Sequence, residues 1–186
     1  MSGADRQTFK KSVGTTDNQS VCQKMGTKKR TLQVERDKLL QDIRKVLNGP
    51  QSLQETLRRV VQLLHGSFDH FDWTGIYLLR GDILELSEYL GAPTVHTRIP
   101  VGEGICGAAV REKAVLNVPD VSADERYLAC SVETKSELVV PIMKGRKIWG
   151  EIDIDSHTPA AFGKEDEDFL AAVADLLADY LEQLDA

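Results

Sequence analysis

Residues 136–156 decide the fold of this chain, and they read Ser-Glu-Leu-Val-Val-Pro-Ile-Met-Lys-Gly-Arg-Lys-Ile-Trp-Gly-Glu-Ile-Asp-Ile-Asp-Ser. Two runs of strand-forming residues flank a Lys-Gly-Arg turn, so the segment predicts a β-hairpin. Side chains alternate along a strand, which places Glu151, Asp153 and Asp155 on one face and the isoleucines between them on the other. Asp is among the poorest strand formers. The acidic face therefore indicates a polar pocket, although Asp155 could instead begin a turn or cap a helix.

The remaining periodicity predicts an α+β fold. Apolar residues at helical spacing indicate helices, and alternating or continuous apolar runs between turn residues indicate strands. The helices are expected at 31–47, 52–65, 105–113 and 165–184, and the strands at 72–80, 83–90, 95–101, 114–118, 137–143 and 147–155. Hairpin-linked strands between terminal helices predict one antiparallel sheet, with the N- and C-terminal helices on one face and a ligand pocket on the other.

Length and charge limit the possible functions. The 186 residues suit one domain, expected at 31–186 with N-terminal helices over 31–66 and a core over 68–184. Residues 1–30 carry seven basic and two acidic residues and predict a disordered basic tail, whereas the rest carries 16 basic and 27 acidic residues. An acidic body argues against nucleic acid as a partner. The chain has no apolar run of about 18 residues and no signal-peptide pattern, so we expect a cytoplasmic protein without a membrane partner.

Two further patterns bear on cofactor and metal binding. Gly102, Gly104 and Gly107 match the spacing of a dinucleotide fingerprint, but that fingerprint needs a parallel βαβ unit, and hairpins surround it here. A glycine turn that opens a short helix is the favoured interpretation. The four histidines show no metal-ligand spacing with one another or with the cysteines, so no metal and no cofactor are expected.

Aromatic and thiol side chains supply the other candidates. Trp73 and Tyr77 share a strand face with Gly75 between them, which fits either core packing or an aromatic wall with room for a small ligand. An odd number of cysteines without a secretory signal indicates reduced thiols. Cys130 is either an inert buried thiol or a reactive one, and Cys106 is expected to be packed near the start of a short helix.

From about Phe68 to Leu184 the sequence resembles the small GAF-domain enzymes that reduce free methionine-R-sulfoxide. The matching residues are Asp72-Trp-Thr-Gly-Ile-Tyr77, Arg98-Ile-Pro-Val-Gly-Glu-Gly-Ile-Cys106-Gly, Ala129-Cys130, Ser136-Glu-Leu-Val-Val-Pro141, Gly150-Glu-Ile-Asp-Ile-Asp-Ser156, Phe162 and Asp166. GAF folds alone are weak evidence of function, because function depends on the site that a fold carries. The cysteine with its carboxylates and the Trp/Tyr pair is the more specific combination.

The resemblance implies an enzyme with a GAF-like fold and a thiol mechanism. The thiolate of Cys130 would attack the sulfoxide sulfur, release methionine and become a sulfenic acid. Glu137 and Asp155 would be the catalytic acids, since burial beside other carboxylates raises a pKa. The substrate-binding residues implied are Trp73, Tyr77, Glu137, Asp153 and Asp155. Thioredoxin or a small thiol would then reduce the enzyme, which the family leads us to expect as a homodimer.

One position departs from the family pattern. The family usually carries its resolving cysteine just before the Arg-Ile-Pro segment, where this chain has His96. Cys106 is the possible resolving residue, Cys22 is a second candidate if the tail folds back, and an external thiol is a third. Loss of this cysteine also keeps an alternative open, in which the chain is a non-catalytic GAF module that binds a small metabolite or senses the redox state.

Overall fold

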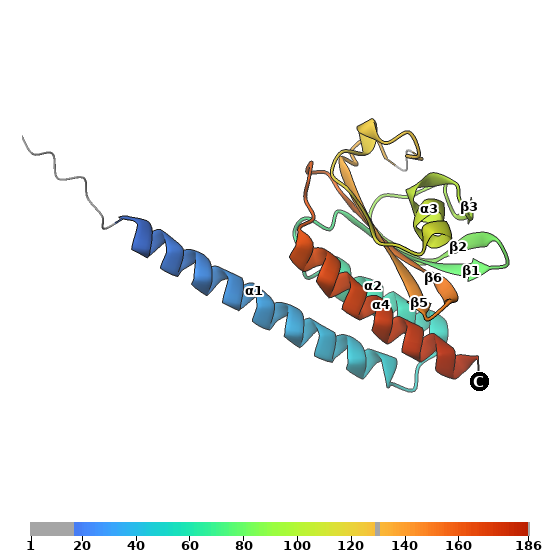
Figure 1. The fold of residues 1–186 in the computed structure, drawn as a ribbon. Coiled ribbons are helices and arrows are strands. Elements are labelled where there is room, and N and C mark those ends of the chain that lie inside the picture. Colours follow the sequence, from blue (N-terminus) through green and yellow to red (C-terminus); the bar gives the residue numbers. More distant parts are fainter. Residues whose placement is uncertain (1–16, 129–130, 186) are drawn as a thin grey trace, which may run out of the picture. The chain divides into compact units, whose positions relative to one another are not determined.

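The computed structural model describes residues 17–128 and 131–185 of the chain (Figure 1). The chain divides into two compact units, Met1–Asp37 and Lys38–Ala186. The first helix, α1 (Asp17–Leu47), begins well before the predicted start at Thr31. Residues 17–30 include good helix formers such as Lys, Gln and Met but few apolar residues, so amphipathic spacing does not reveal this part of the helix. Residues 1–16 of the predicted tail lie outside the described residues.

A six-stranded antiparallel sheet forms the centre of the second unit. Its strands follow the order β3-β2-β1-β6-β5-β4, and each neighbouring pair is antiparallel. The strands are β1 (Trp73–Arg80), β2 (Ile83–Leu90), β3 (Arg98–Pro100), β4 (Leu116–Val118), β5 (Ser136–Lys144) and β6 (Lys147–Ser156). The predicted α+β class with one antiparallel sheet is confirmed. The strand expected at 95–101 is shorter, because its pairing is limited to the first three residues of β2.

Helices cover one face of the sheet, as predicted (Figure 1). Apolar side chains of these helices and of the sheet form one core there. The helices α2 (Leu53–His65) and α4 (Lys164–Leu184) and the last turns of α1 share one hydrophobic core with Ile152 and Ile154 of β6. Ser52 caps α2 by accepting a hydrogen bond from the Glu55 amide (3.3 Å). Among the described residues, no helix has the length and apolar character needed to cross a membrane.

The opposite face carries a smaller core beneath the helix α3 (Gly104–Glu112). Gly102 and Gly104 have φ angles of +94° and +67°, so the chain turns sharply into α3. A Cβ atom at Gly107 would lie 2.5 Å from the Pro100 carbonyl oxygen, so the helix approaches the preceding loop closely. The glycine turn that opens a short helix is therefore confirmed. A single 3₁₀ turn (Val121–Ala123) follows β4.

The contact between β1 and β6 generates a stability prediction. A Cβ atom at Gly150 would lie 1.9 Å from the Tyr77 carbonyl oxygen on the neighbouring strand. We expect Gly150→Ala to lower the free energy of unfolding by roughly 3 kcal/mol or more, because two paired backbones must separate. Gly81→Ala is the matched control. It also has a positive φ (+60°) but no neighbour within 4 Å, so its cost should be about 1 kcal/mol. Equal losses in urea denaturation would contradict the packing explanation.

Candidate functional site

The candidate site lies on the α3 face of the sheet, opposite the face that the other helices cover. Its first members are Glu151, Asp153 and Asp155 of β6, which point away from the core that holds Ile152 and Ile154. All three acidic side chains are buried, with at most 3% of their surface exposed. The sequence prediction that these residues share one face is confirmed.

The two strands beside β6 bring further residues to the same face. Directly opposite residues of an antiparallel pair share a face. On β1, Trp73 lies opposite Asp155 and Tyr77 lies opposite Glu151. On β5, Glu137 lies opposite Asp155. Backbone register alone therefore brings the predicted aromatic pair and the predicted acids onto the same sheet face.

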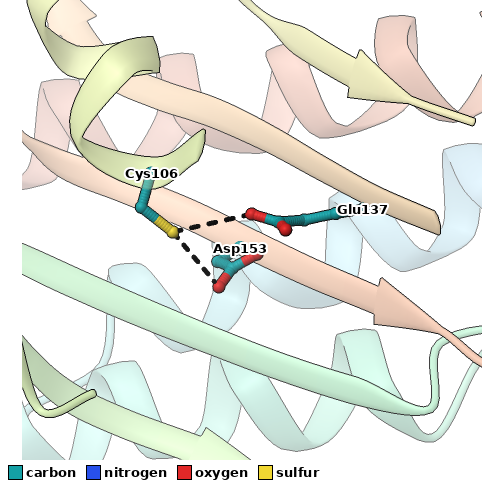
Figure 2. Close-up of side chains that lie close together, drawn as sticks. All are labelled: Cys106, Glu137 and Asp153. Carbon is teal, nitrogen blue, oxygen red and sulfur yellow. Dashed lines mark hydrogen bonds between the residues drawn. The ribbon is translucent and has the colours of Figure 1, made fainter. Parts of the chain in front are cut away.

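Cys106 reaches this face from α3 (Figure 2). Its Sγ atom donates hydrogen bonds to Asp153 Oδ2 at 3.4 Å and to Glu137 Oε1 at 3.8 Å. The thiol is a weak donor, and its contacts leave Asp153 Oδ1 and both oxygens of Glu151 without a hydrogen-bond partner among the described residues. The site thus contains four buried carboxyl groups and one thiol, held by three different elements.

Burial controls the protonation of this cluster. Desolvation raises the pKa of Glu151 and of Asp153 to about 8, and for Asp153 the charge of Glu151 adds to the effect. Burial, followed by the neighbouring acids, raises the pKa of Glu137 and of Asp155 well above their usual ranges. The carboxyl groups therefore retain protons near neutral pH in the free protein, which makes them potential acids.

The same surroundings keep Cys106 in its neutral form. Burial, and then the charges of Asp153, Glu151 and Glu137, raise the pKa of this thiol well above its usual value. A thiol is nucleophilic as the thiolate, so Cys106 is unreactive in this arrangement. A reaction of Cys106 requires an opposing charge or a rearrangement of the site.

Cys130 lies outside the described residues, but the chain on both sides of it can be placed. Before it, the Leu128 side chain packs beside Gly104 at the start of α3. After it, the Ser131 carbonyl accepts a hydrogen bond from the Tyr127 hydroxyl (3.2 Å). Ser131 also lines a small cavity with Trp73 and Asp155. Leu128 is therefore placed beside the start of α3, and Ser131 is placed beside Asp155.

The cavity is too small to hold an amino acid without movement of side chains. Its volume is about 40 Å³, compared with roughly 300–1,000 Å³ for ordinary ligand pockets. Asp155 lies at its inner side and accepts a hydrogen bond from Thr134 (3.4 Å). The lining residues are Asp72, Trp73, Ala92, Thr94, Ser131, Thr134, Asp155 and His157.

The Trp73 ring fills the space at Gly75 that the aromatic-wall alternative leaves for a ligand. The Trp73 indole lies over Gly75, where a Cβ atom would be 2.3 Å from the indole Cη2 atom. The indole also stacks on Tyr89 with ring centroids 5.6 Å apart and donates a hydrogen bond to the Ala92 carbonyl. Gly75 thus accommodates Trp73 itself rather than a ligand, which favours the core-packing alternative at this position.

Tyr77 connects the site to His96, the residue at which this chain departs from the family pattern. This residue is completely buried, and its hydroxyl donates a hydrogen bond to the His96 carbonyl at 2.8 Å. Sequence reasoning missed this connection because it depends on the loop between β2 and β3. It also missed Tyr89, although the register places Tyr89 opposite Gly75, and Thr134, which no sequence pattern singles out.

Comparison with known proteins identifies relatives of this arrangement. The GAF domain family model matches residues 52–181. Free methionine-R-sulfoxide reductase of Escherichia coli is 36% identical over 129 residues, covering 69% of this chain and 78% of that protein. GAF domain-containing protein A of Dictyostelium discoideum is 36% identical over 142 residues, covering 76% of this chain and 89% of that protein. The structure of type II free methionine-R-sulfoxide reductase from Thermoplasma acidophilum superposes with a TM-score of 0.67 at 39% identity, covering 71% of this chain and 96% of that one.

The raised pKa values predict how stability depends on pH. The folded protein binds more protons than the unfolded chain between the ordinary carboxyl pKa values and about 8, so stability should fall as the pH rises through this window. We expect Glu151→Gln to flatten the fall and to increase the free energy of unfolding at about pH 8. The exposed Glu125, changed to Gln, is the control and should leave the profile unchanged. Denaturant titrations from about pH 5 to pH 9 test this, and identical profiles for all three proteins would contradict it.

Proposed function

This chain belongs to the GAF domain family, and we propose that it is an enzyme that reduces free L-methionine-R-sulfoxide to methionine. The observation that carries the proposal is the buried acidic face, on which Glu137, Asp153 and Asp155 lie beside Trp73. The chain next to Cys130 lines the same cavity as Asp155. The similarity to named free methionine-R-sulfoxide reductases supports this assignment.

The acids account for the activation of the substrate. A sulfoxide sulfur becomes a good electrophile only when its oxygen accepts a proton or a strong hydrogen bond. Glu137 and Asp155 hold protons near neutral pH because burial raises the pKa of both groups. In our proposal one of these acids donates its proton to the sulfoxide oxygen as the thiolate attacks.

The nucleophile in this proposal is the thiolate of Cys130. It forms a bond to the sulfoxide sulfur while the oxygen takes a proton from the acid. The protonated oxygen then moves to the cysteine sulfur, and the bond between the two sulfurs breaks. Methionine leaves with its sulfur reduced by two electrons, and Cys130 becomes a sulfenic acid, oxidised by two electrons.

The same face has groups suited to the rest of the substrate. A free amino acid carries an ammonium group, and an ionised Asp153 or Asp155 attracts that charge. The ammonium in turn lowers the pKa of the carboxyl group that it approaches. Trp73 borders the cavity and offers an apolar surface for the methyl group. Entry of the substrate requires Trp73 or its neighbours to move, since the cavity is small.

The sulfenic acid needs a second thiol to complete the cycle. A thiol condenses with it, water leaves, and the disulfide is then reduced by an external dithiol such as thioredoxin. His96 cannot form a disulfide, so we propose that Cys106 or an external thiol takes this role. Cys106 is buried against Asp153 and Glu137, so a role as resolving residue requires α3 or the Cys130 segment to shift.

Activity measurements on cysteine variants test the proposal. The protein is mixed with free L-methionine-R-sulfoxide or with the S form, with dithiothreitol or a thioredoxin system as reductant, and methionine is quantified. We expect methionine from the R form and its complete loss in Cys130→Ser. Loss in Cys106→Ser with thioredoxin but not with dithiothreitol would identify Cys106 as the resolving residue.

The same experiment decides between the enzyme and a binding module. Replacement of the usual resolving cysteine by His96 is the observation that favours a non-catalytic GAF module. If neither reductant supports methionine formation, the reductase proposal fails. A metabolite-binding or redox-sensing role then replaces it.

A variant of Glu137 tests whether this residue is the acid that donates the proton. We expect Glu137→Gln to lower kcat/KM for the R sulfoxide by about 10²–10⁴-fold, because an amide cannot deliver the proton. Glu125→Gln removes an exposed carboxylate as the control and should remain within about twofold of the unmodified protein. A Glu137→Gln enzyme with unchanged kcat/KM would assign the acid to another residue.

A further inference from the structure

The proposed reaction leaves one carboxyl group of the cluster without a role. It uses Glu137, Asp153 and Asp155, with Cys106 as a candidate resolving thiol, but not Glu151. Glu151 is completely buried, and neither of its carboxylate oxygens has a hydrogen-bond partner among the described residues. One oxygen of Asp153 is in the same condition. Buried unpaired polar atoms are costly, so a ligand that pairs with these oxygens would be favoured there.

The geometry of the cluster fits a tetrahedral metal ion. Cys106 Sγ, a Glu137 oxygen and an Asp153 oxygen all lie within 4.8 Å of one another. Zinc bonds of about 2.3 Å to sulfur and 2.0 Å to oxygen give a sulfur-to-oxygen edge of about 3.5 Å in a tetrahedron. The observed sulfur-to-oxygen separations are 3.4 and 3.8 Å (Figure 2).

Glu151 lies next to this set on β6. It precedes Asp153 by two positions, so the two side chains are adjacent on one face. The three ligand groups come from α3, β5 and β6, and Glu151 adds a further carboxyl group beside Asp153. Their positions far apart in the sequence explain why ligand spacing does not reveal them.

We propose that Cys106, Glu137 and Asp153, with the carboxyl group of Glu151 beside them, form a binding site for a thiophilic divalent cation, with Zn²⁺ as the favoured ion. A thiolate ligand selects zinc over magnesium and calcium, which prefer six or more oxygen ligands. The ion displaces the Cys106 proton and gives a partner to the unpaired oxygens of Glu151 and Asp153. Its charge also offsets that of the carboxylates.

The site has a consequence for the proposed reaction. Zn²⁺ and the substrate would compete, because the proposed function assigns Glu137 and Asp153 to the sulfoxide. This consequence rests on the proposed function. The binding of the cation does not, and it can be measured without turnover.

Cobalt titration tests the site directly. The reduced, metal-free protein is titrated with Co²⁺, which gives a thiolate-to-metal charge-transfer absorption when sulfur is a ligand. We expect one Co²⁺ per chain with this absorption, and its loss when Zn²⁺ is added. Glu151→Gln should weaken binding by at least about tenfold, the loss typical of changes around a metal site.

The cysteine variants identify the thiol ligand. Cys106→Ser should lose the absorption, while Cys130→Ser and Cys22→Ser should keep it, and circular dichroism verifies that each variant folds. Absence of the absorption in the unmodified protein would overturn the site. Its persistence in Cys106→Ser, its loss in Cys130→Ser or unchanged affinity in Glu151→Gln would do the same. If Cys106→Ser does not fold, Asp153→Asn and Glu151→Gln still decide the outcome.

Discussion

Four carboxyl groups are buried on one face of this sheet, and burial is the main cause of the raised pKa of each group. The cost of burying their charge is the constraint on which the site depends. The groups keep their protons, bind a cation or face a ligand with a complementary group. The proposed acid for a sulfoxide oxygen, the proposed carboxylate for an ammonium group and the proposed oxygen ligands for a metal would all follow from this one constraint.

The scaffold that imposes the burial is simple. Ile152 and Ile154 pack β6 against the helices. The acidic residues that alternate with them along the strand therefore face α3. α3 then closes over the acids and adds Cys106. Trp73, stacked on Tyr89 and hydrogen-bonded to the chain after β2, borders the cavity beside Asp155. Packing of the apolar face of β6 against the helices therefore fixes its acidic side chains on the opposite face, where the site lies.

The sequence predicts those features that depend on local pattern. Alternation along β6 predicts the shared face of Glu151, Asp153 and Asp155, and the hairpin turns predict an antiparallel sheet. The position of Cys106 against Asp153 is not predictable in this way, because it depends on the packing of α3, 47 residues away in the chain. The choice between core packing and a ligand space at Gly75 is not predictable for a related reason. A period-two pattern gives the face of Trp73 but not its rotamer, and the indole turns over the glycine.

The proton content of the cluster also has a thermodynamic consequence. Groups such as Glu151 and Asp153, whose pKa values lie near 8, are largely protonated at neutral pH. A cationic ligand that binds them as carboxylates must expel those protons into the solvent. The heat of binding then contains the heat of protonating the buffer. The apparent enthalpy is therefore a property of protein, ligand and buffer together, and the number of protons released counts the carboxyl and thiol groups that the ligand ionises.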